Sequence, residues 1–188
     1  FALGIAVASR GADHLRNRPT LDILKLPDDV RMKIFGVPTS SDPTSYEGKA
    51  GMVAWHDDIY AVADSLGICK FITHGFNSPK LLGYDHFVEL IQSVAGLNFS
   101  EGELRGVGKR VIDIERQINL EIGRTRADDT LPKRYFDDPM PSRATKGHHI
   151  DREKFQKMLD EYYEARGWNN EGHLSQERLA ELDAFVAE

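Results

Sequence analysis

Two short segments carry residues whose types and spacing suit binding or catalysis. In the first, Ala8–Arg16, Arg10 and His14 stand four residues apart. If this segment is helical, the two side chains share one face, where buried cations repel unless an anion such as a phosphate lies between them. The alternative is the end of a surface helix with solvated charges. The motif alone favours this alternative at least as much as an anion site.

The second segment runs from Asp64 to Lys70 and contains Cys69, the single cysteine of the chain. Gly67 permits a turn of positive φ, which can direct successive backbone N–H groups at one point. A thiolate among such donors is a good iron–sulfur ligand. A lone cysteine is more often a small buried apolar residue, so this segment by itself is weak evidence.

Several other chemistries are excluded by spacing. No acidic residue stands three positions before any of the seven histidines, and no two histidines stand four apart, which excludes the helical di-iron and zincin patterns. Gly106-Val107-Gly108 falls inside an expected helix, which favours close helix packing over a nucleotide-binding loop. His148 and His149 lie in a polar stretch and are expected to be solvated.

Composition limits the class of protein. The 188 residues suffice for one domain or two small ones, and a net charge of −6 argues against nucleic-acid binding. One cysteine excludes a disulfide framework, and no apolar run reaches the roughly 18–20 residues of a membrane span. The first residues, FALGIAVASRG, lack the basic region of a signal peptide and suggest a buried element of a longer protein.

The apolar periodicity predicts an all-α, multihelical domain. Apolar residues recur at steps of three and four, which predicts helices over 48–67, 85–95, 100–123, 155–166 and 175–186. Ser100 and Glu103 form a capping-box signature, and the helix that they open carries the stripe Leu104, Val107, Val111, Ile114 and Ile118. No stretch alternates with period two, so no sheet is expected.

Two long irregular loops interrupt the helices. Arg18–Ser45 carries four prolines and is expected to hold only short helical turns. Arg124–Ile150 is long for a connection in a compact domain. Its Arg-rich start, with Asp128 and Asp129, either closes an entrance or meets a neighbouring domain, or else forms a charged surface strap.

Taken together and in order, these segments resemble the C-terminal all-helical part of the tungsten-containing aldehyde ferredoxin oxidoreductase family. The resemblance spans residues 1–188, with a subdivision near residue 98 left open. The matching pieces are ASRGADHLR (8–16), YEGKA (46–50), DSLGICKF (64–71), the run from Ser100 to Arg134 and MLDEYYEARGWNNEG (158–172). The resemblance implies tungstopterin, a tungsten ion held by two pterin dithiolenes, with one 4Fe–4S cluster close by.

The resemblance also implies a cofactor-binding role for the second segment. Cys69 resembles the fourth cluster ligand, with the other three thiolates upstream of this chain. Asp64 resembles a carboxylate that hydrogen-bonds a pterin ring, and Ile68 and Lys70 resemble neighbours of the same pterin.

In the first segment, Arg10 and Arg16 resemble basic residues that contact the pterin phosphates and rings. His14 resembles the active-site histidine near tungsten, paired with a glutamate outside this chain. Asp13 departs from the family, because relatives often carry a smaller or sulfur-bearing residue there. The Arg18–Ser45 loop is also long for the family.

The expected function is part of a cytoplasmic oxidoreductase that oxidises aldehydes to carboxylic acids and passes electrons through the cluster to ferredoxin. Its expected partners are the remaining N-terminal domains of the same enzyme, ferredoxin or an electron-transfer subunit, and a small aldehyde, with no nucleic acid or membrane. Two alternatives stay open: the tungsten subunit of an aromatic acyl-CoA reductase, and a helical interaction domain without a cofactor. The sequence leaves open the aldehyde, tungsten versus molybdenum, the electron acceptor and assembly into an oligomer.

Overall fold

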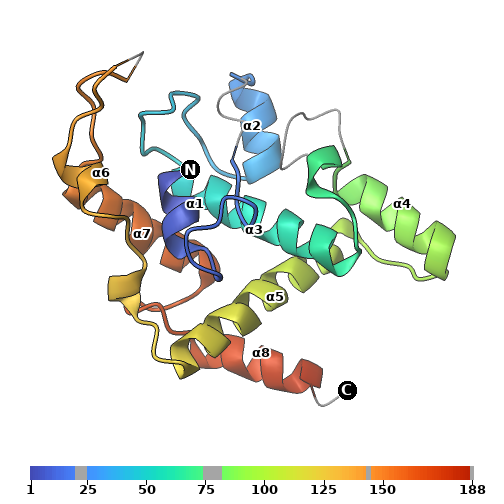
Figure 1. Cartoon of the computed structure of the whole chain (residues 1–188). Coiled ribbons are helices and arrows are strands. Elements are labelled where there is room, and N and C mark those ends of the chain that lie inside the picture. The colour runs from blue at the N-terminus through green and yellow to red at the C-terminus, as the bar shows by residue number, and fades with distance from the viewer. Residues whose placement is uncertain (20–24, 74–81, 143–144, 187–188) are drawn as a thin grey trace.

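The computed structural model describes residues 1–19, 25–73, 82–142 and 145–186, and within them the chain is all-α, as predicted (Figure 1). The described part contains two isolated β-bridges but no strand. It has two 3₁₀ turns, η1 (Lys70–Ile72) and η2 (Arg126–Asp128). Its α-helices are α1 (Ala2–Val7), α2 (Asp28–Phe35), α3 (Lys49–Ser65), α4 (Tyr84–Ala95), α5 (Glu101–Glu121), α6 (Arg134–Asp137), α7 (Arg152–Arg166) and α8 (Gln176–Val186).

Helix α3 is the centre of the fold. It packs against α5, α7 and α1, and in Figure 1 it crosses the middle of the molecule. Its predicted stripe is buried at Met52, Trp55, Ile59 and Val62. One apolar cluster joins α3 to α1 and α7, and a second joins it to α4 and the start of α5. Burial of these side chains from two sides is the main stabilising contribution.

Helix α5 begins and ends where the sequence indicates. The Ser100 hydroxyl accepts the N–H of Glu103, and the Glu103 carboxylate accepts the N–H of Ser100, which lowers the pKa of Glu103. The helix ends just before Gly123, whose φ is +93°. Gly108 packs directly on α3: a Cβ there would stand 2.4 Å from the carbonyl oxygen of Asp58. The helix-packing interpretation of this glycine is therefore confirmed.

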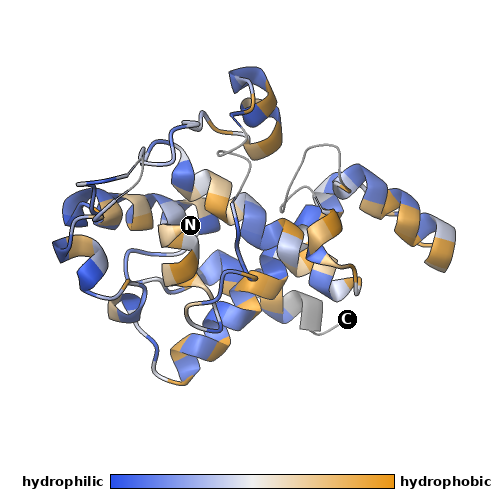
Figure 2. Cartoon of the chain, turned by 45° about the horizontal axis from the view of Figure 1, so that its top comes forward, coloured by the Kyte–Doolittle hydropathy of each residue, from blue (hydrophilic) through white to orange (hydrophobic). Residues whose placement is uncertain are grey.

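The apolar stripe of α5 is mostly not part of the core. Leu104 is buried, but Ile114 and Ile118 are 39% and 54% exposed, and Ile122 beyond the helix end is 77% exposed. The helix packs instead through Gly108 and two polar residues, Asp113 and Arg116. The periodicity thus predicted the helix, but it did not identify the face that this chain buries. Figure 2 shows a similar apolar side along α4, the helix that projects at the right.

The two proline-containing loops are partly helical. The first holds α2, eight residues long, which exceeds the short turns expected there. The second holds only η2 and the four-residue α6. Residues 20–24 of the first and 143–144 of the second lie outside the described part. None of the described helices combines the length and apolarity needed to cross a membrane.

Candidate functional site

The segment Ala8–Asn17 is a series of turns, so the helix considered for it is not formed. Helix α1 ends at Val7, and Gly11 follows with a φ of +88°, a conformation that a helix does not contain. The Asp13 carboxylate then accepts the N–H of Leu15 in an Asx-type turn, at 2.7 Å. The side chains of Arg10 and His14 therefore do not share a helical face.

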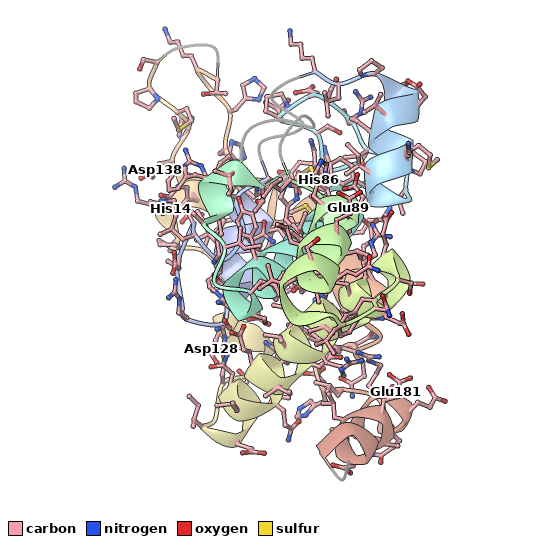
Figure 3. All side chains as sticks on the ribbon, turned by 90° about the vertical axis from the view of Figure 1, so that its right-hand side faces the viewer. His14, His86, Glu89, Asp128, Asp138 and Glu181 are labelled. Carbon is pink, nitrogen blue, oxygen red and sulfur yellow. The ribbon has the colours of Figure 1, made fainter. Side chains whose placement is uncertain are left out.

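Arg10 has a local partner, because its guanidinium donates to the Asp13 carboxylate. The Leu15 N–H and the Arg10 charge both lower the pKa of Asp13. Arg10 and His14 are both exposed, and Figure 3 shows His14 at the left of the view, apart from Glu181 of α8 at the lower right. The sequence argument for an anion between buried Arg10 and His14 therefore does not hold.

The turn that follows α3 has the positive φ expected at Gly67, but the N–H groups of Gly67 and Ile68 donate to carbonyls of α3 and are not directed at Cys69. Gly67 has a φ of +67°, and the N–H of Ile68 reaches back to the Ala63 carbonyl at 2.8 Å, closing the helix end. Ile68 is half-buried against the second apolar cluster. Cys69 is a free, exposed thiol. The turn therefore anchors Ile68 in the protein and leaves Cys69 accessible.

An ionic cluster brings the two predicted segments together. The Asp64 carboxylate accepts from Arg16 Nη1 at 2.9 Å and from Lys70 Nζ at 2.8 Å. Lys70 Nζ also donates to the backbone carbonyl of Leu15, next to His14, at 2.8 Å. Asp64 is 42% exposed in its side chain, whereas Arg16 and Lys70 are mostly covered. We call Arg16, Asp64 and Lys70, with Glu115 below, the outer ionic cluster.

Glu115 of α5 is a member of this cluster that the sequence analysis missed. Its carboxylate accepts from Arg16 Nη2, so Arg16 bridges α5 and the turn after α3. The two residues lie far apart in the chain, and no local pattern links them. The only relevant signal was a carboxylate within the apolar-rich run of α5.

A second, deeper cluster joins α3 to α7. Arg166 Nη2 donates to Asp57 at 2.8 Å, and a second guanidinium nitrogen binds Asp58. Burial raises the pKa of Asp58, although the charge of Arg166 opposes the shift. Asn17, at the end of the first segment, donates to Asp57 and to the Val53 carbonyl. We call these four residues the inner ionic cluster.

The exposed groups suit one edge of a cofactor rather than a complete metal centre. In the part of the chain that the structure describes, no three histidine, cysteine or acidic side chains are grouped so as to hold a metal ion. Cys69 provides one soft thiol, Asp64 an accessible acceptor, and Arg16 and Lys70 positive charge. Any iron–sulfur cluster here needs further thiolates from outside this chain, since four ligands are usual.

Comparison with known proteins gives a consistent result. Residues 1–183 match the family described as "Aldehyde ferredoxin oxidoreductase, domains 2 & 3". Tungsten-containing aldehyde ferredoxin oxidoreductases of Pyrococcus furiosus and Pyrococcus horikoshii are 34% and 33% identical over 182 residues, 96% of this chain and 27% of each relative. The WOR-like subunit of an aliphatic sulfonate oxidoreductase from Pyrococcus furiosus is 30% identical over 95% of this chain.

A solved structure has a similar fold. The active site complex BamBC of benzoyl coenzyme A reductase, in complex with 1,5-dienoyl-CoA, matches with a TM-score of 0.63. The match covers 88% of this chain and 25% of that one, at 23% identity, so the likeness concerns the fold alone. The chain thus spans about a quarter of the length of the proteins that it matches.

Proposed function

This chain belongs to the aldehyde ferredoxin oxidoreductase family, and we propose that it forms one wall of a tungsten–pterin site in a longer enzyme that oxidises aldehydes to carboxylic acids. The observation that carries the proposal is the outer ionic cluster. It joins Arg16, Asp64 and Lys70, and it lies directly beside Cys69 and His14 in the chain. All seven predicted site residues thus belong to two segments that contact each other.

The residues fit the cofactor chemically. Cys69 is accessible and would supply one of four thiolates to a 4Fe–4S cluster, the others coming from upstream. The exposed oxygen of Asp64 would accept from a pterin N–H, beside half-buried Ile68. When bound, the tungsten–pterin group supplies the two-electron oxidation, and the cluster carries the electrons onward.

The cations of this chain would balance the charge of the cofactor. Arg16 and Lys70 are paired with Asp64 and Glu115, and they would offset the negative dithiolene and phosphate groups by exchanging one of these carboxylates for the cofactor. Arg10 is exposed and held only by Asp13, so it can turn toward a phosphate. Lys70 also fixes the Leu15 carbonyl and thereby sets the position of the neighbouring residue, His14.

His14 would move the proton. An imidazole can accept a proton from water, or return one, at a pH near neutrality, and His14 is exposed on the loop that carries Arg16. Its position one residue before the carbonyl held by Lys70 keeps it beside the proposed cofactor wall.

The remaining domains of the same enzyme would cover this face. The chain spans 27% of the length of its relatives. Ile114, Ile118 and Ile122 form an exposed apolar stripe, and Ile114 directly precedes Glu115 in the chain. Such a stripe beside charged side chains is typical of an interface. Ferredoxin or another electron-transfer protein and a small aldehyde are the further proposed partners.

The first test is elemental analysis and an aldehyde oxidation assay of the parent enzyme purified without oxygen. We expect about one tungsten and four iron atoms per chain, as one tungsten–pterin site and one 4Fe–4S cluster require. Absence of both metals from undamaged protein would favour a helical interaction domain. Reduction of an aromatic acyl-CoA by a larger complex would favour the reductase alternative.

A second test addresses His14. The variant His14→Ala should keep tungsten and iron but lose about 10²- to 10⁴-fold in turnover, the usual worth of a positioned acid or base. His173→Ala, an exposed histidine at the other end of the chain, serves as the control. Unchanged turnover in His14→Ala would remove this residue from the mechanism.

A further inference from the structure

Arg124, in the connection after α5, binds the end of α1. Its Nη1 donates to the Ala8 carbonyl at 2.9 Å, and its Nη2 donates to the Ala6 carbonyl at 3.0 Å. The last carbonyls of a helix have no partner within the helix, so one guanidinium satisfies two of them. This is the point at which the Ala8–Asn17 loop, which carries His14, leaves α1.

Arg124 is itself held by Asp129, whose side chain is completely buried. Asp129 Oδ1 accepts from Arg124 Nη2 at 2.8 Å, and Oδ2 accepts from Arg116 Nη1 at 2.7 Å. The hydroxyl of Tyr163 also donates to Oδ2, and burial raises the pKa of Tyr163, which keeps this donor protonated. Arg116 of α5 and Tyr163 of α7 thus fix the Asp129 carboxylate, which in turn binds Arg124.

The loop is fastened at both ends and exposed between them. Asn119 of α5 donates to the Ser9 carbonyl at 2.9 Å, and Asn17 enters the inner ionic cluster at the other end. The intervening residues Arg10, His14 and Leu15 are exposed. The position of His14 therefore depends on where these two ends are held, together with the Leu15 carbonyl bound by Lys70 and the ion pairs of Arg16.

The Arg124–Arg134 run, which begins the Arg124–Ile150 loop, is exposed over most of its length, as expected of a surface strap. Asp128 is exposed and caps the Thr125 N–H at 2.8 Å. Asp129, by contrast, is buried. Through Arg124 and Asp129 the run supports a loop that lies more than a hundred residues earlier in the chain.

We propose that Asp129 and Arg124 are positioning residues of the active site: they fix the carbonyl end of α1 and so set where His14 stands relative to the outer ionic cluster. The inference rests on the proposed function for the role of His14. Asp129 is buried, and Arg124 lines a small pocket with Arg16 and Glu115 of the outer ionic cluster, so Asp129 acts through Arg124, and Arg124 acts on the loop through the carbonyls that it binds.

The test is Arg124→Lys in the parent enzyme. A lysine has a single nitrogen and cannot bind two carbonyls and a carboxylate in the fork geometry of arginine. We expect unchanged tungsten and iron, a fall of about 10- to 100-fold in kcat per tungsten, as misplacement of a catalytic group produces, and a much smaller change in KM. Amide hydrogen exchange should accelerate within residues 8–17.

Arg126→Lys provides the matched control. Arg126 lies two residues on and binds the Asn170 carbonyl and Gln156, with no bond to the loop that the structure records. The variant Arg126→Lys should leave both kcat per tungsten and amide hydrogen exchange in residues 8–17 at wild-type values. If Arg124→Lys does not accumulate, Asn119→Ala removes only the Ser9 contact and should give the same changes in smaller measure.

The outcomes separate this inference from the proposed function. If the wild-type enzyme oxidises aldehydes and Arg124→Lys equals Arg126→Lys in kcat per tungsten, the positioning inference is wrong and the proposed function stands. Equal exchange of residues 8–17 in the two variants also overturns the inference. If the wild-type enzyme lacks aldehyde activity, the proposed function is wrong. The proposed catalytic role of His14, and its positioning by Arg124, are then wrong as well.

Discussion

Helix α3 carries two ionic clusters of similar composition and very different exposure. The inner one pairs Asp57 and Asp58 with Arg166, whose side chain is 1% exposed. The outer one pairs Asp64 with Arg16 and Lys70, and Asp64 is 42% exposed. Asp57 and Asp64 lie two helical turns apart, so they occupy nearly the same face of one helix.

The comparison shows that burial separates a structural cluster from one that is accessible to a ligand. Arg166 cannot leave its partners without stranding buried charge, which is costly, so the inner cluster is committed to joining α3 and α7. Asp64 faces solvent on one side and can exchange a partner for a ligand at little cost. The same residue types therefore serve different ends, according to what covers them.

The largest effect is expected from breaking the inner cluster. Arg166→Met keeps the volume but leaves Asp57 and Asp58 without their cation, and should lower the free energy of unfolding by about 3–5 kcal/mol. Calorimetry of the parent enzyme measures this as a lowered Tm. Arg105→Met, on the exposed side of α5, is the control and should change Tm little. Equal effects of the two variants would contradict the structural role of the inner cluster.

A smaller effect on stability, but a large one on cofactor, is expected from Asp64→Asn. An exposed ion pair contributes about 0–1 kcal/mol, so folding should be nearly unchanged. Because the asparagine side chain lacks the negative charge that holds Arg16 and Lys70, we expect several-fold less tungsten per chain by elemental analysis. The control Asp138→Asn, altered at an exposed position, should contain as much tungsten as the wild type. Full tungsten in Asp64→Asn would count against this carboxylate as a pterin contact.

The smallest effect concerns pH at the His14 loop. The pKa of Asp13 lies below its ordinary value of 3.8 because the Leu15 N–H and Arg10 favour the ionised form. The stabilisation is therefore fully present above pH 3.8 and is lost as the pH falls through the lowered pKa. Wild-type protein and Asp13→Asn should differ in amide exchange of Leu15 at about pH 5 and converge in stronger acid. No difference at any pH would show that this turn does not depend on the carboxylate.

The sequence allowed most of the fold to be predicted, because helix signals are local. The stripe of α3, the Ser100–Glu103 box and the glycines after α4, α5 and α7 each depend on residues within a few positions. The buried face of α5 was not predictable, since it depends on what lies opposite. Gly108 and Arg116 pack against other elements, while Ile114 and Ile118 remain 39% and 54% exposed.

In the candidate site, too, the local features were predictable and the distant contacts were not. The turn with Gly67 and Cys69 is local and was found, whereas the helix considered for Ala8–Arg16 was wrong because Gly11 and Asp13 direct the chain into turns. The contacts that fasten this loop come from α5 and the run after it, and pairs so distant leave no short-range pattern. The resemblance named residues expected to contact the cofactor, but the supporting residues, such as Asp129, required the structure.

If the turn after α3 forms one edge of the cofactor site, the iron content of the enzyme depends on Cys69. Wild-type parent enzyme, Cys69→Ala and the control Ser93→Ala, all prepared without oxygen, should be analysed for iron per folded chain. We expect Cys69→Ala to lose most of its iron and Ser93→Ala, altered at an exposed position of α4, to retain it. Full iron in Cys69→Ala would show that this turn does not hold the cluster.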